Sequence, residues 1–171
     1  MSSFSMEASS EAPNRRRIAV RGVLNEDARL PAIDFTGVDE VVFDFLELKG
    51  MNSVGIRSWI YWVPAVPAAR MVNCPYFLVQ QFTMVKGLLP DRFRVDSILL
   101  PVLCESCDRE AKVLLDLNKL RHDSKSPFDA HAFVRAQACD SKPCDVEADF
   151  FEQTVEKFVR SQLGTSSFPG R

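Results

Sequence analysis

A change of hydrophobic period within residues 41–63 constrains the fold more than any other feature of the sequence. Residues 41–48 (VVFDFLEL) are rich in β-branched and aromatic side chains, which predicts a buried strand. Apolar residues then recur at helical spacing and predict a helix with one buried stripe. The stripe consists of Ile56, Trp59, Ile60 and Val63. Pro64 ends this helix, and Ser53 is expected to cap its start, because a serine hydroxyl accepts a hydrogen bond from an unpaired backbone N–H.

Strands and helices alternate along the rest of the chain. Further strands are predicted at 17–24, 70–74, 92–103 and 111–117. A second helix opens at Pro75 and ends by Gly87 and Pro90, and a final helix spans 146–163 with Phe151, Val155, Phe158 and Val159 on one face. Residues 118–138 are expected to be irregular. This alternation predicts an α/β fold in which helices cover a mixed sheet, followed by a small β-hairpin and a C-terminal helix.

The domain organisation follows from length and composition. A chain of 171 residues suits one domain with a small addition. Residues 1–16 are polar and Ser-rich at their start, which predicts a disordered tail. We expect the α/β domain over 17–100, the hairpin and C-terminal helix over 101–163, and a flexible tail over 164–171.

Charge and hydropathy narrow the class of partner. The net charge is −2, and the basic residues are dispersed, so neither a nucleic acid nor a membrane is indicated as a partner. The longest apolar stretch, 59–69, contains two prolines and is too short to span a bilayer. With no export signal in the sequence, a soluble cytoplasmic protein is expected.

The five cysteines predict a metal site. Cys104 and Cys107 are separated by two residues at a predicted hairpin turn, and Cys139 and Cys144, separated by four, provide a second pair. Cys74 stands alone and is expected to be buried. Two such pairs can bind one structural zinc ion tetrahedrally, as in a zinc ribbon. The alternative is four unrelated thiols. His122 and His131 are reserve ligands, and a redox role for the first pair is weaker because redox pairs usually open a helix.

The stretch VVFDFLELKGMNSVGIRSWI resembles the STAS domain of anti-sigma-factor antagonists. In that family a hydrophobic strand leads through an Asp-Ser-x-Gly loop into a helix. Here the loop reads Asn52, Ser53, Val54, Gly55, with Arg57 and Trp59 beyond it, as in bacterial STAS-like proteins. Two later motifs also fit, Asn73-Cys74-Pro75 and Pro101-x-x-Cys104-x-x-Cys107, and the resemblance covers about residues 17–163.

The resemblance implies a regulatory role for Ser53, because a kinase phosphorylates the serine of this loop in partner-switching members. A phosphate at a helix N-terminus also meets unpaired N–H groups. The alternative is that Ser53 only caps the helix. Arg57 is expected beside it as a solvated surface residue, and the alternatives are binding to an acidic partner or pairing with Asp44 or Glu47. Trp59, Tyr61 and Trp62 are expected to lie mostly in or near the core. Because Tyr61 and Trp62 cannot both lie on the apolar stripe, part of this cluster indicates an exposed binding patch.

These features favour a non-enzymatic protein-binding regulatory module, with a homodimer compatible with the exposed aromatics. The sequence contains only two histidines and no phosphate-binding glycine loop or nucleophile motif. The alternatives are a structural scaffold or oligomerisation protein, a thiol enzyme that pairs Cys139 with His131, and a nucleic-acid-binding ribbon that uses the small basic cluster at 119–125.

Overall fold

The computed structural model describes residues 3–104, 106–122, 127–137 and 146–164. The chain divides into two compact units, Met1–Asp96 and Ser97–Arg171. The division falls four residues before the predicted boundary at 100/101. The single strand predicted at 92–103 is two strands, β6 (Phe93–Val95) and β7 (Ser97–Cys104), which are separated by Asp96.

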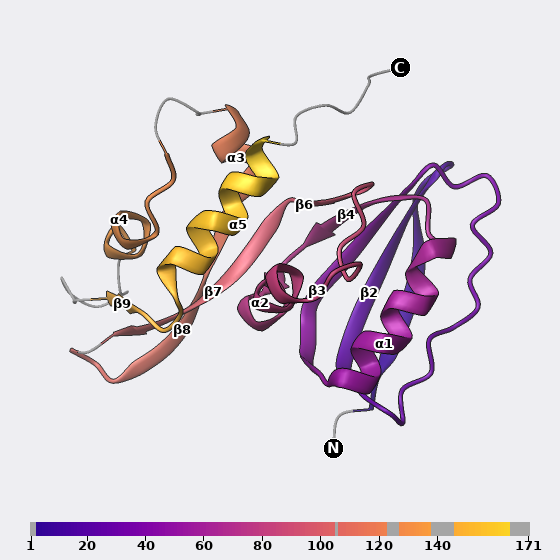
Figure 1. The fold of residues 1–171 in the computed structure, drawn as a ribbon, viewed down its shortest axis with the longest axis horizontal. Helices are drawn as coiled ribbons and strands as arrows, with labels where there is room; N and C mark the ends of the chain where they lie inside the picture. Colours follow the sequence, from indigo (N-terminus) through magenta and orange to yellow (C-terminus); the bar gives the residue numbers. More distant parts are fainter. Residues whose placement is uncertain (1–2, 105, 123–126, 138–145, 165–171) are drawn as a thin grey trace. The chain divides into compact units, whose positions relative to one another are not determined.

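The first unit contains a five-stranded sheet in the order β1-β2-β3-β4-β6 (Figure 1). Its other strands are β1 (Ser5–Ala12), β2 (Arg15–Leu24), β3 (Glu40–Met51) and β4 (Ala68–Val72). β1 runs antiparallel to β2, and the remaining neighbours pair in parallel. The strands predicted at 17–24 and 41–48 are confirmed, and the one predicted at 70–74 begins and ends two residues earlier. The mixed α/β class is therefore confirmed.

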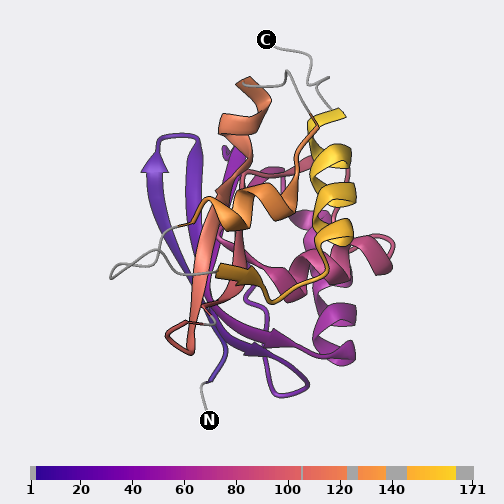
Figure 2. The ribbon, with the colours of Figure 1, turned by 90° about the vertical axis from the view of Figure 1, so that its left-hand side faces the viewer.

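The expected disordered tail over residues 1–16 is wrong, because strand β1 occupies most of it and pairs with β2 (Figure 2). Most β1 side chains are exposed, so burial does not order the strand. Ion pairs across the ladder add to the backbone pairing, with Glu7 2.5 Å from Arg21 and Glu11 3.3 Å from Arg17. A polar composition predicts disorder for an isolated segment, but here pairing with β2 orders the chain.

The helices of the first unit enclose an aromatic core on one face of the sheet. They are α1 (Ser53–Trp62), the short 3-10 helix η1 (Val63–Ala65) and α2 (Tyr76–Met84), with the two-residue strand β5 (Cys74–Pro75) before α2. The ring of Trp59 packs edge-on against Phe43 at 5.3 Å, and its Nε1–H donates to the Leu88 carbonyl at 3.1 Å. Trp62 also packs against Phe43 and donates its Nε1–H to the Pro31 carbonyl at 2.8 Å. Both tryptophans thus fix α1 to the core.

The opposite face of the sheet carries charged side chains in rows that cross the strands. One row passes in register from Arg17 through Val42 and Arg70 to Arg94, on β2, β3, β4 and β6. Because side chains alternate between the two faces of a strand, residues two positions further along point the same way. Asp44 on β3 is such a residue, and it pairs with Arg17 at 2.6 Å.

The second unit contains an antiparallel sheet with β7 at its centre. β8 (Arg109–Asp116) pairs with β7 along its length, and β9 (Val146–Ala148) pairs with the distal half of β7. The predicted hairpin is therefore confirmed. Its helices are α3 (Leu117–His122), α4 (Ala130–Arg135) and α5 (Glu152–Gly164).

Two expectations for this unit are wrong. The stretch 118–138, predicted to be irregular, contains α4 and most of α3, which are too short to show helical periodicity and are stabilised by aspartates. Asp116 Oδ1 accepts from the Asn118 amide at 2.9 Å, and Asp129 Oδ1 accepts from the Ala132 amide at 2.8 Å. The helix predicted over 146–163 begins only at residue 152.

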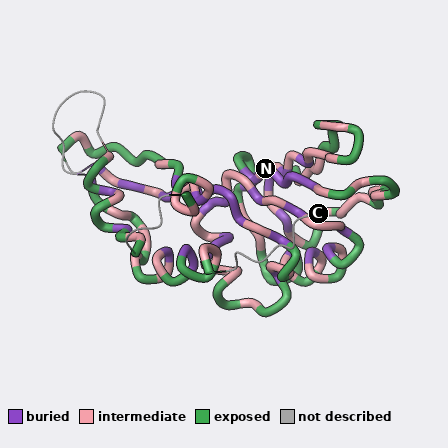
Figure 3. The backbone as a smooth tube through the Cα atoms, turned by 90° about the horizontal axis from the view of Figure 1, so that it is seen from above, coloured by how far each residue is buried: buried purple, intermediate pink, exposed green. Residues whose placement is uncertain are grey.

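Within α5 the predicted apolar face is confirmed at Val155, Phe158 and Val159, which are buried. Phe151, assigned to the same face, precedes the helix and is 72% exposed. Figure 3 shows the buried stretches as purple segments of the tube between green, exposed connections. Among the described residues, no helix combines the length and apolar character needed to cross a membrane.

Candidate functional site

The turn between β3 and α1 is held by Asn52. Its Oδ1 accepts a hydrogen bond from the Gly55 amide at 2.9 Å, and its backbone is extended, so Asn52 is the N-cap of α1. Its Nδ2 donates to Glu26 Oε2 at 2.6 Å. The expectation that Ser53 caps the helix is therefore wrong, since the cap lies one residue earlier. The pKa of Glu26 is lowered by its own backbone N–H and by the hydrogen bond from Asn52.

Gly55 is required where α1 meets the end of β2. A Cβ atom at this position would lie 2.0 Å from the Leu24 carbonyl oxygen, which is backbone and cannot yield. The same carbonyl accepts from the Asn52 amide at 3.1 Å. Ser53, between them, is exposed, and its hydroxyl makes no hydrogen bond within the described part of the chain. The turn thus holds its backbone firmly while the Ser53 side chain faces solvent.

The exposed face of α1 carries three residues at helical spacing. Val54, Arg57 and Tyr61 stand at positions i, i+3 and i+7, and we call them the α1 outer face. Val54 is 46% exposed and Tyr61 is 80% exposed. Of the two aromatic residues that could not both lie on the buried stripe, Tyr61 is the exposed one, whereas Trp62 is half-buried and hydrogen-bonded inward.

Arg57 is exposed, as expected of a solvated surface arginine, and the alternative pairing with Asp44 or Glu47 is not found. Asp44 pairs with Arg17, and Glu47 accepts from the Arg21 Nε at 2.8 Å. Both acidic residues lie on strand β3. The side chain of Asp44 lies on the face of the sheet away from α1, because its neighbour Phe43 points toward α1 and packs against Trp59. Among the described residues Arg57 has no ion pair, so its charge is available to another molecule.

Asp44 and Cys74 have shifted pKa values. Burial raises the pKa of Asp44, but hydrogen bonds from Asn73, Arg17 and the Leu46 amide outweigh burial and lower it below its ordinary value. Asn73 makes its bond at 2.8 Å from a left-handed backbone with φ of 55°. Cys74 is fully buried, as expected, and its thiol pKa is raised by burial and by the charges of Asp96 and Asp44.

The first predicted metal pair lies at the end of the β7–β8 hairpin. The sulfur atoms of Cys104 and Cys107 are 3.0 Å apart, and the Cys107 amide donates to the Cys104 carbonyl at 3.3 Å. Cys104 is buried and Cys107 is partly buried. The second pair, Cys139 and Cys144, lies outside the described residues, which among themselves contain no cluster of three metal-ligating side chains.

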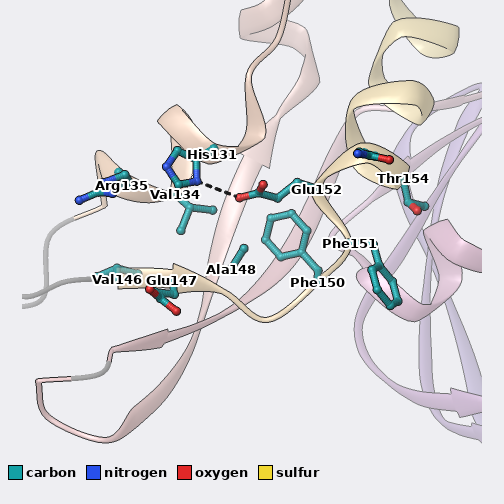
Figure 4. Close-up of a pocket in the computed structure, with 11 residues that line it drawn as sticks. His131, Val134, Arg135, Val146, Glu147, Ala148, Phe150, Phe151, Glu152 and Thr154 are labelled. Atoms are coloured by element: carbon teal, nitrogen blue, oxygen red, sulfur yellow. Dashed lines mark hydrogen bonds and ion pairs between the residues drawn. The ribbon is translucent and has the colours of Figure 1, made fainter.

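A cavity that the sequence did not indicate opens in the second unit. Its volume is about 800 Å³, and α4, β9 and the start of α5 line it. Figure 4 shows the side chains of His131, Phe150 and Glu152 directed toward one another. Nδ1 of His131, one of the reserve metal ligands, lies 3.3 Å from Glu152 Oε1. The other reserve ligand, His122, is exposed at the end of α3.

The described structure brings the loop residues Asn52, Ser53, Gly55 and Arg57 together at one end of α1, as the sequence predicted. The cavity was not predicted because its walls come from segments whose packing leaves no periodic signal in the sequence.

No family model matches the sequence, and a search of curated proteins finds no match either.

Proposed function

We propose that this chain is a non-enzymatic protein-binding regulatory module that contacts its partner through the α1 outer face. The supporting observation is the exposure of Tyr61 beside Arg57 and Val54 on a helix that two tryptophans fix to the core. Tyrosine and arginine are the residue types that most often dominate binding energy at protein interfaces. A rigid helix loses little conformational freedom on binding, so these side chains are well suited to a recognition surface.

Phosphorylation of Ser53 is the proposed control. The hydroxyl is exposed at the first position of α1 and stands one turn before Arg57. A phosphate there would be stabilised by the N-terminal N–H groups of the helix and would place negative charge on the edge of the α1 outer face. The resemblance of the Asn52–Gly55 loop to that of anti-sigma-factor antagonists supports this assignment, and with it a bacterial cytoplasmic signalling role.

The test is photocrosslinking in the cells of origin, with a photoreactive phenylalanine analogue at position 61. We expect a crosslinked protein partner, and we expect Ser53→Asp to reduce its yield while Ser53→Ala does not. The same analogue at Lys86, an exposed position beyond α2, is the control. Equal yields from both positions would contradict the binding surface, and a crosslink only to a second copy of the chain would assign the face to a homodimer.

A structural zinc ion is the second part of the proposal. Cys104 and Cys107 supply two thiol donors on one turn, and Cys139 and Cys144 complete the donor set of a closed site with four protein ligands. Zinc–sulfur bonds of about 2.3 Å place tetrahedral sulfurs about 3.8 Å apart. The first pair, at 3.0 Å, is closer than that, so its sulfurs would move apart by about 0.8 Å on binding zinc. Such a site stabilises the hairpin and offers no position for a reacting water.

A further inference from the structure

The carboxylate of Asp96 holds two arginines side by side at the edge of the first unit's sheet. Arg70 and Arg94 are direct neighbours in the parallel register of β4 and β6, so their side chains leave the sheet on the same face. Arg70 donates its Nε–H to Asp96 Oδ2, and Arg94 donates its Nε–H to Asp96 Oδ1 at 2.9 Å. Each carboxylate oxygen therefore fixes one guanidinium group.

The charges of this cluster do not balance. Asp96 is 2% exposed and carries one negative charge, whereas Arg70 and Arg94 together carry two positive charges. Asp96 is the only described residue to which either guanidinium is hydrogen-bonded or ion-paired. One arginine would be enough to neutralise the buried carboxylate, so the second leaves a surplus of one positive charge.

Both arginine side chains remain partly exposed in spite of this anchoring. The side chain of Arg70 is 29% exposed and that of Arg94 is 37% exposed. A guanidinium has five N–H donors in a rigid fork, and bonding through Nε leaves terminal amino groups for another acceptor. The other arginine in this row, Arg17, differs because its terminal groups already contact Asp44 and Glu11.

We propose that Arg70 and Arg94 form a binding site for a carboxylate side chain of a protein partner, which Asp96 preorganises. One carboxylate carries the single negative charge that neutralises the surplus, and its two oxygens can bridge neighbouring arginines. A phosphate monoester carries a charge near −2 and would leave the site with a net negative charge. The site lies on the face of the sheet away from α1, so it adds a second contact surface and does not depend on the α1 outer face.

The probe is a fluorescein-labelled hexaglutamate peptide, with hexaglutamine as its uncharged counterpart, measured by fluorescence anisotropy at low salt. Arg94→Gln keeps the Arg70–Asp96 pair and should weaken hexaglutamate binding at least about tenfold, because charge-assisted hydrogen bonds are lost. Arg94→Lys should weaken it less. Arg15→Gln removes another arginine of the same face, one paired with Glu40, and should leave binding within about twofold of the wild type.

A measurement on the unaltered protein tests the site even if a variant fails to fold. Hexaglutamate should shift the ¹⁵Nε resonances of Arg70 and Arg94 but not that of Arg15. Equal losses in Arg94→Gln and Arg15→Gln, or unshifted Arg70 and Arg94 resonances, would overturn the site. Tighter binding of a phosphoserine peptide or an oligonucleotide of equal charge would overturn the carboxylate assignment. Tyr61→Ala should leave hexaglutamate binding unchanged. A negative result for the Arg70–Arg94 site would therefore not count against the proposed binding role of the α1 outer face.

Discussion

The side-chain oxygen of Asn52 accepts a hydrogen bond from the Gly55 amide at 2.9 Å. The hydroxyl of Ser53, which lies between them, makes no hydrogen bond within the described residues and so does not cap the helix. This arrangement separates two tasks within one short turn. Asn52 starts the helix, while Ser53 stays exposed to solvent and to any modifying enzyme. A single residue that did both would lose its capping bond each time it was modified.

Replacement of Asn52 by Ala should destabilise the protein by about 1 kcal/mol, because the first turn of α1 loses its cap. Ser53→Ala should change the free energy of unfolding by less than about 0.5 kcal/mol, as is usual for an exposed position without a structural bond. Urea denaturation of both variants measures the difference. A larger loss for Ser53→Ala than for Asn52→Ala would show that the serine is the true cap.

Gly55→Ala should destabilise the first unit by about 2 kcal/mol or more, because the new methyl group would collide with the Leu24 carbonyl oxygen. Gly50→Ala is the matched control. Its Cβ atom would have only an ordinary contact, 3.9 Å from a Val23 methyl group, and we expect a change within about 0.5 kcal/mol. Thermal unfolding followed by circular dichroism compares them, and equal melting temperatures would contradict the close approach of α1 to β2.

The depressed pKa of Asp44 predicts a loss of stability in acid. Its folded-state pKa lies below the unfolded value of about 3.9, so ionised Asp44 stabilises the fold fully above that pH. The contribution is lost as the pH falls through the folded pKa. Asp44→Asn should therefore be less stable than the wild type at pH 7, and the gap should narrow below about pH 4. Asp27→Asn, at an exposed loop position, is the control; a gap that stays constant between pH 7 and pH 2.5 would rule out this role.

Protein purified without chelator should contain one zinc ion per chain, measured by elemental analysis together with native mass spectrometry. Cys107→Ser should lower the zinc content by at least about half, because a closed structural site needs all four ligands. Cys74→Ala changes a buried thiol of the first unit and should leave the zinc content unchanged. Full zinc content in Cys107→Ser would show that the metal is bound elsewhere.

The sequence by itself determined the elements that bury an apolar face over several turns or a whole strand. The runs at 17–24 and 41–48 and the stripe around Trp59 are such elements, since their period of two or 3.6 residues is a local property of the chain. The same reasoning indicated that Tyr61 and Trp62 cannot both lie on the buried stripe, because a helix has room for only one core-facing stripe. Which of the two is exposed was decided by the tertiary structure.

Tertiary structure decided whatever depends on residues distant in sequence. β1 is ordered by its backbone pairing with β2, which the polar composition of residues 1–16 did not predict. Asn52 rather than Ser53 caps α1, although both side chains can accept the bond, because only Asn52 has the extended backbone that begins the helix. Asp96 meets Arg70 and Arg94 only after β4 and β6 pair in register, and no local pattern encodes that register.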